Sequence, residues 1–145
     1  MYSPEEFDEQ KTRVMKYIVF KKRTEQEVRT KFASSIEENM LEDIIEYLKE
    51  ARYLDDSEYI ERAINNFKIL KNLSVKEVKY KLLAKGLNKN DIEDYFYEHK
   101  EELNEYEQQS ARNIFLKKQR DMEKEEIKQY LLKKGYKIDN INFVD

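Results

Sequence analysis

The sequence predicts an all-α protein, organised as an elongated tandem array of three three-helix repeats. Its composition of 41% charged and 39% hydrophobic residues, with one proline and two glycines, leaves little material for tight hairpin turns. The two glycines, Gly86 and Gly135, end nearly identical segments, LLAKG and LLKKG, 49 residues apart. A third copy without glycine begins at Val28, 50 residues before Val78. A period of about fifty is typical of stacked helical units.

The first repeat is predicted over residues 1–54 and includes an N-terminal extension. Ser3 stands directly before a proline and three residues before a glutamate, so a capped helix is expected from there to about Lys22. Thr24 and Glu27 form a second capping box, and the helix behind it should end near Ser35. A third helix is expected over residues 37–52. Its apolar stripe comprises Leu41, Ile44, Ile45 and Leu48.

The second repeat is predicted over residues 55–104. Either Asp55 or Asp56 is expected to cap its first helix. The apolar positions of that helix are Ile60, Ile64, Phe67 and Leu70. Ser74 with Glu77 is a third capping box, and the short helix behind it should end at Gly86, because a left-handed C-cap needs no Cβ. The next helix is marked by Ile92, Tyr95 and Phe96.

The third repeat is predicted over residues 105–145. No proline or glycine interrupts residues 98–110, so a long bent helix is expected to join it to the second repeat. One helix is expected around residues 114–118 and another from about Glu123 to Lys134, closed by Gly135. Ile138 and Ile141 should begin a short last helix.

Composition predicts a soluble, cytoplasmic protein. The chain has no cysteine, which suits a reducing compartment and excludes disulfides and thiolate metal sites. The first residues are acidic and lack the features of a secretion signal, and no stretch approaches the roughly 18 apolar residues of a membrane span. The net charge is -3, from 28 basic and 31 acidic residues, so any contact with nucleic acid has to be local.

Three motifs together indicate a family. The segment YLDDSEY at residues 53–59 begins with an aromatic residue, an aliphatic residue and two aspartates, which precede a predicted helix. Residues 78–86 are predicted to form a helix that carries, in order, an aliphatic residue, a basic residue, Leu, Lys and Gly. Residues 127–135 repeat this pattern. In order and spacing these motifs resemble the RecX family, bacterial regulators of the RecA recombinase that are built from tandem three-helix repeats. The resemblance covers about residues 12–143.

The resemblance implies a non-enzymatic protein that lies along the helical groove of RecA filaments and impedes their growth or function. Such a protein damps recombination, DNA repair and the SOS response, although some relatives act positively. The implied partner is the RecA filament, with room for weak contact with single- or double-stranded DNA. A finished array with polar ends is expected to be a monomer.

Charge along the chain is segregated into zones, which indicates a striped surface. Residues 68–89 hold seven lysines against one acid, and residues 112–137 hold nine basic side chains against four acidic ones. Residues 91–107 hold eight acidic side chains and residues 37–50 hold six. Charge runs are ordinarily solvated faces, but both basic zones include the same helix of successive repeats. The predicted partner-binding residues are Lys79, Lys81, Lys85, Arg112, Lys117, Lys118, Lys128, Lys133 and Lys134.

Two other kinds of binding protein fit parts of the pattern. A generic helical-repeat adaptor would use the same stripes to bind another protein. A helix-turn-helix DNA-binding protein would use residues 78–86 and 90–97 as its two helices. The second of these helices is acidic at Asp91, Glu93 and Asp94, which argues against contact with base edges.

An enzyme is not expected, and no cofactor or metal is predicted. The one histidine, His99, has no second histidine or cysteine with which to share a metal, so an exposed structural role is expected for it. The carboxylates are expected on solvated helix faces, and no glycine-rich phosphate loop is present. The aromatic residues predicted in the core include Tyr17, Phe32, Tyr47, Phe67 and Phe96.

Overall fold

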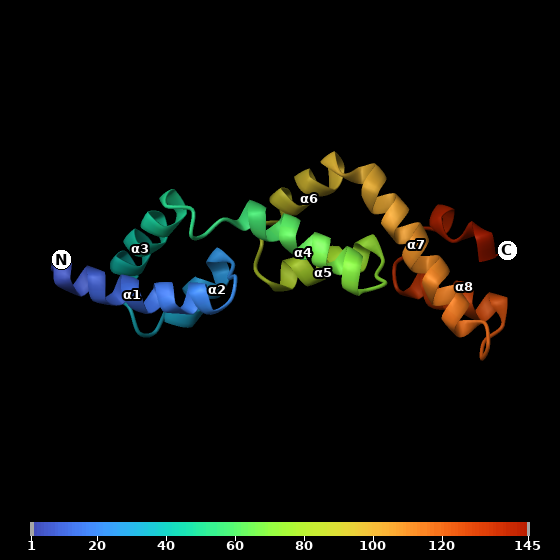
Figure 1. Cartoon of the computed structure of the whole chain (residues 1–145), viewed down its shortest axis with the longest axis horizontal. Helices are drawn as coiled ribbons and strands as arrows, with labels where there is room; N and C mark the ends of the chain where they lie inside the picture. The colour runs from blue at the N-terminus through green and yellow to red at the C-terminus, as the bar shows by residue number, and fades with distance from the viewer. Residues whose placement is uncertain (1, 145) are drawn as a thin grey trace. The chain divides into compact units, whose positions relative to one another are not determined.

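The protein is all-α, as the sequence predicts. The structure, a computed structural model, describes residues 2–144, and within them it contains eight α-helices and two short 3₁₀ turns but no strand (Figure 1). The helices are α1 (Pro4–Phe20), α2 (Glu25–Phe32), α3 (Glu38–Glu50), α4 (Asp56–Leu70), α5 (Val75–Ala84), α6 (Lys89–Glu98), α7 (Lys100–Lys118) and α8 (Lys124–Lys133). The turns are η1 (Ile138–Asn140) and η2 (Asn142–Val144). No helix in this part of the chain is long and apolar enough to cross a bilayer.

The described chain divides into two compact units. Unit 1 contains residues 2–59 together with Lys85–Leu87, and unit 2 contains Ile60–Ala84 together with residues 88–144. Unit 1 is therefore discontinuous in sequence, because it includes three residues that follow α5. The division into three repeats stays a prediction.

The core of unit 1 lies between α1, α2 and α3. Its buried side chains are Val14, Ile18, Val28, Phe32, Ile36, Met40, Leu41, Ile44, Ile45, Leu48 and Leu54. The predicted apolar stripe of α3 is among them, because its spacing places every member on one helix face. After α3 the chain turns through Arg52, whose φ of 63° is left-handed, and the N–H of Tyr53 closes the helix on the carbonyl of Leu48 at 2.8 Å.

Unit 2 differs from the sequence prediction in two helices and in one residue of the predicted core. The helix expected around residues 114–118 is the last part of α7, which begins at Lys100. The predicted join between the second and third repeats lies at His99, which follows the last residue of α6 and precedes the first residue of α7. The expected last helix is replaced by the turns η1 and η2. Leu70, predicted on the apolar face of α4, is 75% exposed, whereas Ile60 and Ile64 are buried.

The hydroxyl side chains that cap α2 and α5 also hold the chain that follows α5 and α8. Thr24 Oγ1 accepts the N–H of Glu27 at 3.1 Å and donates to the carbonyl of Lys85 at 2.7 Å. Fifty residues on, Ser74 Oγ accepts the N–H of Glu77 at 3.0 Å and donates to the carbonyl of Lys134 at 2.7 Å. Two of the three predicted capping boxes are confirmed, and in each the hydroxyl is fully buried. At the third, Ser3 Oγ accepts the N–H of Glu6 at 3.1 Å, which is half of the box.

A carboxylate binds the first N–H of the same two helices. Asp56 Oδ1 accepts the N–H of Glu25 at 3.0 Å, and Glu107 Oε1 accepts the N–H of Val75 at 2.8 Å. Asp55 instead caps α4, by accepting the N–H of Glu58 at 3.1 Å. Both aspartates therefore serve helix N-termini, but of different helices.

Both glycines are required by backbone conformation and by space. Gly86 has φ +82° and Gly135 has φ +97°, so the predicted left-handed C-caps are confirmed. A Cβ on Gly86 would lie 2.4 Å from Cβ of Gln26, and a Cβ on Gly135 would lie 2.9 Å from Cδ of Lys76. The contacts are equivalent, because Gln26 and Lys76 follow the capping residues Thr24 and Ser74 by two positions.

Candidate partner-binding surface

The nine predicted basic residues lie on three helices and the segments that follow two of them. Lys85 follows α5 and belongs to unit 1, whereas the other eight residues belong to unit 2. They are Lys79 and Lys81 on α5, Arg112, Lys117 and Lys118 on α7, Lys128 and Lys133 on α8, and Lys134 at the C-cap of α8.

The members on and after α5 are largely paired with carboxylates. Lys79 Nζ lies 3.1 Å from Glu93 Oε1 on α6, and Lys85 Nζ lies 3.8 Å from Glu27 Oε2 on α2. Lys81 is exposed, and no ion pair of Lys81 is seen within residues 2–144. Surface ion pairs of this kind contribute about 0–1 kcal/mol to stability, so a binding partner can compete for Lys79 and Lys85. In the unbound protein, however, the carboxylates partly neutralise the charge of these two lysines.

Four members, Lys117, Lys118, Lys133 and Lys134, are available as cations. Lys118 Nζ lies 4.4 Å from the ring centroid of Tyr130, and Lys134 Nζ lies 5.6 Å from the same centroid. The ring attracts both ammonium groups without cancelling their charge. For these two residues and for Lys117 and Lys133, no carboxylate lies within ion-pair distance in the described part of the chain. The geometry therefore brings Lys118 and Lys134 together at Tyr130, and Lys117 and Lys133 are their neighbours in sequence; these four lysines are the basic cluster.

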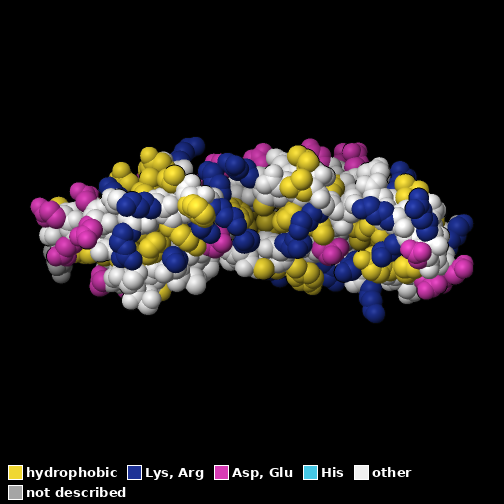
Figure 2. All heavy atoms as spheres, turned by 60° about the horizontal axis from the view of Figure 1, so that its bottom comes forward, with side chains coloured by type: hydrophobic (Ala, Val, Ile, Leu, Met, Phe, Trp, Pro, Cys, Tyr) yellow, Lys and Arg dark blue, Asp and Glu magenta, His cyan; other side chains and the backbone are white. Residues whose placement is uncertain are grey.

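Arg112 and Lys128, the rest of the predicted set, are not among the residues that line a hollow on α8. The guanidinium carbon of Arg112 lies 5.6 Å from the ring centroid of Phe143, and Lys128 is half-buried and held by its own contacts within the protein. The hollow has a volume of about 660 Å³. It is lined by Met122, Glu125, Glu126, Gln129, Tyr130, Leu132 and Lys133. Figure 2 shows a face on which lysine and arginine side chains alternate with hydrophobic ones.

A similar aromatic and basic cluster in unit 1 was not predicted. The guanidinium carbon of Arg23 lies 3.9 Å from the ring centroid of Tyr17, and Lys31 Nζ lies 5.8 Å from it. Tyr17 also packs edge-on against Phe32, with ring centroids 5.6 Å apart. Tyr17 therefore contacts the core, as predicted, and also contacts two basic side chains. The run KKR directly after α1 is the sequence signal that could have identified this cluster.

Glu107 on α7 corrects the prediction that the carboxylates lie on solvated faces. Its side chain is fully buried. Besides the N–H of Val75, it accepts the N–H of Lys137 at 3.2 Å and a hydrogen bond from Asn140 Nδ2. These donors replace the water that an ionised carboxylate loses on burial. Tyr47, predicted in the core, is 44% exposed, which is a second correction.

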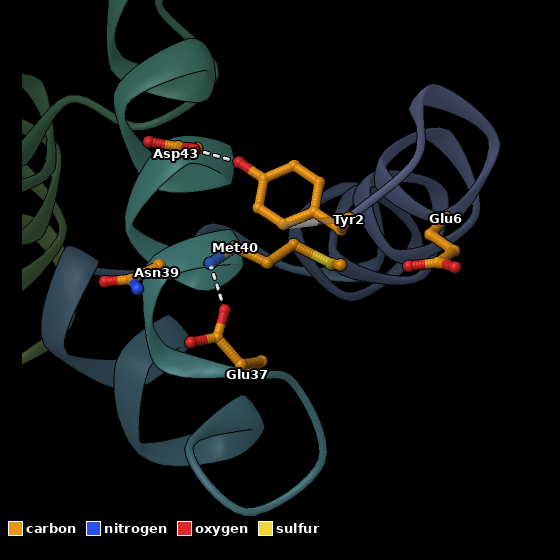
Figure 3. Close-up of a pocket in the computed structure, with 6 residues that line it drawn as sticks. All are labelled: Tyr2, Glu6, Glu37, Asn39, Met40 and Asp43. Atoms are coloured by element: carbon orange, nitrogen blue, oxygen red, sulfur yellow. Dashed lines mark hydrogen bonds between the residues drawn. The ribbon is translucent and has the colours of Figure 1, made fainter.

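A second hollow, of about 540 Å³, lies between the start of the chain and α3 and has an acidic lining (Figure 3). Its walls are Tyr2, Glu6, Glu37, Asn39, Met40 and Asp43. The Tyr2 hydroxyl donates to the Asp43 carboxylate, and this hydrogen bond is the main cause that raises the pKa of Tyr2 to about 12. Glu37 caps α3 by accepting the N–H of Met40 at 3.0 Å. No residue of this hollow was predicted as functional.

His99 is half-buried at the α6–α7 join, which differs from the exposed position expected for it. Its ring stacks on Tyr95 with centroids 3.9 Å apart, and Nδ1 lies 3.0 Å from the carbonyl oxygen of Tyr95. Within residues 2–144 no three histidine, aspartate or glutamate side chains are arranged to hold a metal ion. The His99 side chain therefore packs on the last turn of α6.

Comparisons with known proteins agree on one family. No protein-family model matches the chain. The chain is 33% identical over 144 residues to the regulatory protein RecX of Clostridium acetobutylicum, covering 92% of this chain and 66% of the relative. It is 29% identical to the regulatory protein RecX of Staphylococcus carnosus, with 88% and 49% covered. The chain thus spans between half and two thirds of the length of these relatives.

Two crystal structures share the fold. That of RecX from Lactobacillus salivarius superimposes with a TM-score of 0.82 at 23% identity, covering 98% of this chain and 96% of the other. A second, of a regulatory protein RecX, gives a TM-score of 0.81 at 19% identity, covering 95% and 72%. The sequence relatives and the motifs at residues 53–59, 78–86 and 127–135 lead to the same conclusion. This chain belongs to the RecX family.

Proposed function

We propose that this chain is a non-enzymatic regulator that binds RecA nucleoprotein filaments and inhibits recombinase activity, and with it recombination and the SOS response. It acts in the cytoplasm as a monomer. Membership of a family of regulatory proteins supports the regulatory role. The observation that carries the binding mode is the convergence of Lys118 and Lys134 on Tyr130, with Lys117 and Lys133 next to them in sequence; none of these four lysines has an ion-pair partner within residues 2–144.

The charge pattern suits a surface that presents both phosphates and protein carboxylates. The net charge of -3 gives the whole molecule no attraction to a polyanion, so a local cluster has to orient it. Complementary potential sets the register of binding and speeds encounter more than it adds affinity. The acidic α6 would turn away from phosphates, since Asp91, Glu93 and Asp94 repel them.

The proposed architecture is a tandem array of three repeats, over residues 1–54, 55–104 and 105–145. The recurring bonds of Thr24 to Lys85 and of Ser74 to Lys134 support it, because each ties the second helix of one predicted repeat to the end of the second helix of the next. An array of this kind buries each unit only against its neighbours.

The test is the single-strand-DNA-dependent ATPase activity of the cognate RecA, measured while the full chain is titrated from well below one-to-one stoichiometry up to it. Inhibition at substoichiometric amounts, with no ATPase activity from this chain alone, is the expected result and indicates blocked filament growth. No effect at equimolar protein, with filament assembly verified, would favour the helical-repeat adaptor. Tight binding to duplex DNA alone, with a log–log salt slope of about -0.9 per phosphate neutralised, would favour the helix-turn-helix alternative.

Charge reversal tests the assigned residues. Lys128→Glu, Lys133→Glu and Lys134→Glu together should weaken filament binding at least about tenfold and leave helicity intact, because two of these side chains are exposed and the third is half-buried. The control changes three exposed lysines elsewhere, Lys16, Lys89 and Lys100, to glutamate and so alters the net charge equally. Equal binding by the two triple variants would show that Lys128, Lys133 and Lys134 are not the contact.

A further inference from the structure

The last two residues of α1 and of α4 are large, apolar and exposed. Val19 and Phe20 are 74% and 84% exposed, and Ile69 and Leu70 are 79% and 75% exposed. The two pairs lie 50 residues apart, which is the period of the repeat. Each pair ends its helix, because α1 ends at Phe20 and α4 ends at Leu70.

Helix geometry explains why neither pair contributes to the core of its own unit. Ile18 and Ile64 face the interior, and each further residue turns about 100° around the helix axis. An apolar residue scattered singly on the surface needs no explanation, but grouped ones mark interaction sites. Two adjacent residues exposed at the same position of two successive repeats form a repeated group.

Basic residues follow each apolar pair. Lys21, Lys22 and Arg23 come directly after the pair on α1, and Lys71 comes directly after the pair on α4. α7 ends in a similar way, with Leu116 59% exposed before Lys117. The surface that fits such a helix end is apolar with an acidic rim, because opposite charges align two surfaces and like charges exclude wrong partners.

We propose that the exposed helix ends Val19–Phe20 and Ile69–Leu70 dock apolar, acid-rimmed sites on the protein subunits of the filament, one helix end to a subunit. This inference rests on the proposed function, whose basic cluster shares no residue with these helix ends. Nucleic acid is the less suitable occupant, because bases stack on aromatic rings and arginine planes, and three of these four side chains are aliphatic. Two equivalent sites on one chain match a partner that presents the same surface in every subunit, and joint engagement raises the overall affinity.

The test uses two double variants of the full chain, Val19→Gln with Phe20→Gln and Ile69→Gln with Leu70→Gln. Glutamine retains helix propensity, so the helices should form as before. The matched control is Tyr97→Gln on the acidic helix α6, where the side chain is 80% exposed. Each protein is titrated against filaments of the cognate RecA on single-stranded DNA, and separately against the same DNA without RecA.

Each double variant should bind filaments at least about tenfold more weakly than the wild type, and the combined variant should be weaker still, while Tyr97→Gln binds normally. Binding to bare DNA should be unchanged in all of them. Wild-type filament binding decides the proposed function, and its absence would overturn both proposals. Normal filament binding by the double variants would overturn this inference alone. A parallel loss on bare DNA would assign the pairs to nucleic acid, and a wild-type dimer that the variants dissolve would assign them to a second copy of the chain.

Discussion

The buried carboxylate of Glu107 should be a major determinant of stability in unit 2, and Glu107→Gln tests this. Glutamine has nearly the same shape but offers one acceptor oxygen in place of two. That oxygen can keep either the bond from Val75 or the bonds from Lys137 and Asn140, and the amide group then faces the donors on the other side.

The expected loss follows from these contacts. A hydrogen bond to a charged group is worth about 1.5–3 kcal/mol, and a buried donor left without an acceptor adds its own penalty. The amide also removes a negative charge from the N-terminus of α5, although it is easier to bury than a carboxylate. We therefore expect the free energy of unfolding to fall by about 2–3 kcal/mol.

The assay is urea unfolding followed by far-ultraviolet circular dichroism and by tyrosine fluorescence. With a denaturant slope of about 2 kcal/mol per molar, the midpoint should fall by about 1–1.5 M at an unchanged slope. Glu105→Gln, on the exposed side of the same helix, is the control and should change the free energy by less than about 0.5 kcal/mol. Equal midpoints for the two variants would refute the argument. Asn140→Ala combined with Glu107→Gln should cost less than the sum of the single changes, since the two side chains are bonded.

Three further predictions follow from the caps, the turn after α3 and the start of the chain. Thr24→Ala and Ser74→Ala should each lower the free energy of unfolding by about 2 kcal/mol in the same assay, because each removes a cap and a bond to a distant carbonyl. Arg52→Gly should raise the thermal midpoint, since its left-handed φ of 63° costs a residue with a side chain about 1 kcal/mol. Tyr2 should ionise near pH 12, and Tyr2→Phe should remove that step from an ultraviolet titration. Because the pKa of Tyr2 is raised in the folded protein, the hydrogen bond from Tyr2 to Asp43 stabilises the fold below about pH 10, and this stabilisation is lost between pH 10 and pH 12.

Helix caps were predictable because their signals are local. Thr24 and Ser74 each stand three residues before the glutamate with which they exchange hydrogen bonds. The extent of α7 was not predictable, because its buried positions include Glu107 and Ser110, so the hydrophobic period that would mark the helix is interrupted. The partners of Glu107 lie 30 or more residues away in sequence, and nothing near Glu107 indicates them.

The candidate surface could be predicted as a set of residues but not as an arrangement. Repeat positions place Lys79 on a helix, but its partner Glu93 comes from another helix, and only the structure identifies the pair. The convergence of Lys118 and Lys134 on Tyr130 likewise requires two helices to pack. Leu70 has the right spacing for the core, yet it lies in the last turn of α4, where no neighbouring element covers it.

The bond from Thr24 to Lys85 has a consequence for synthesis on the ribosome. The acceptor carbonyl is translated 61 residues after the donor hydroxyl, which at about 5–20 residues per second is a delay of roughly 3–12 seconds. Until Lys85–Leu87 are made, residues 2–59 lack the three residues that complete their compact unit. The nascent chain therefore carries a vacant docking position for its own later segment, and a chaperone or a neighbouring nascent copy could occupy it first.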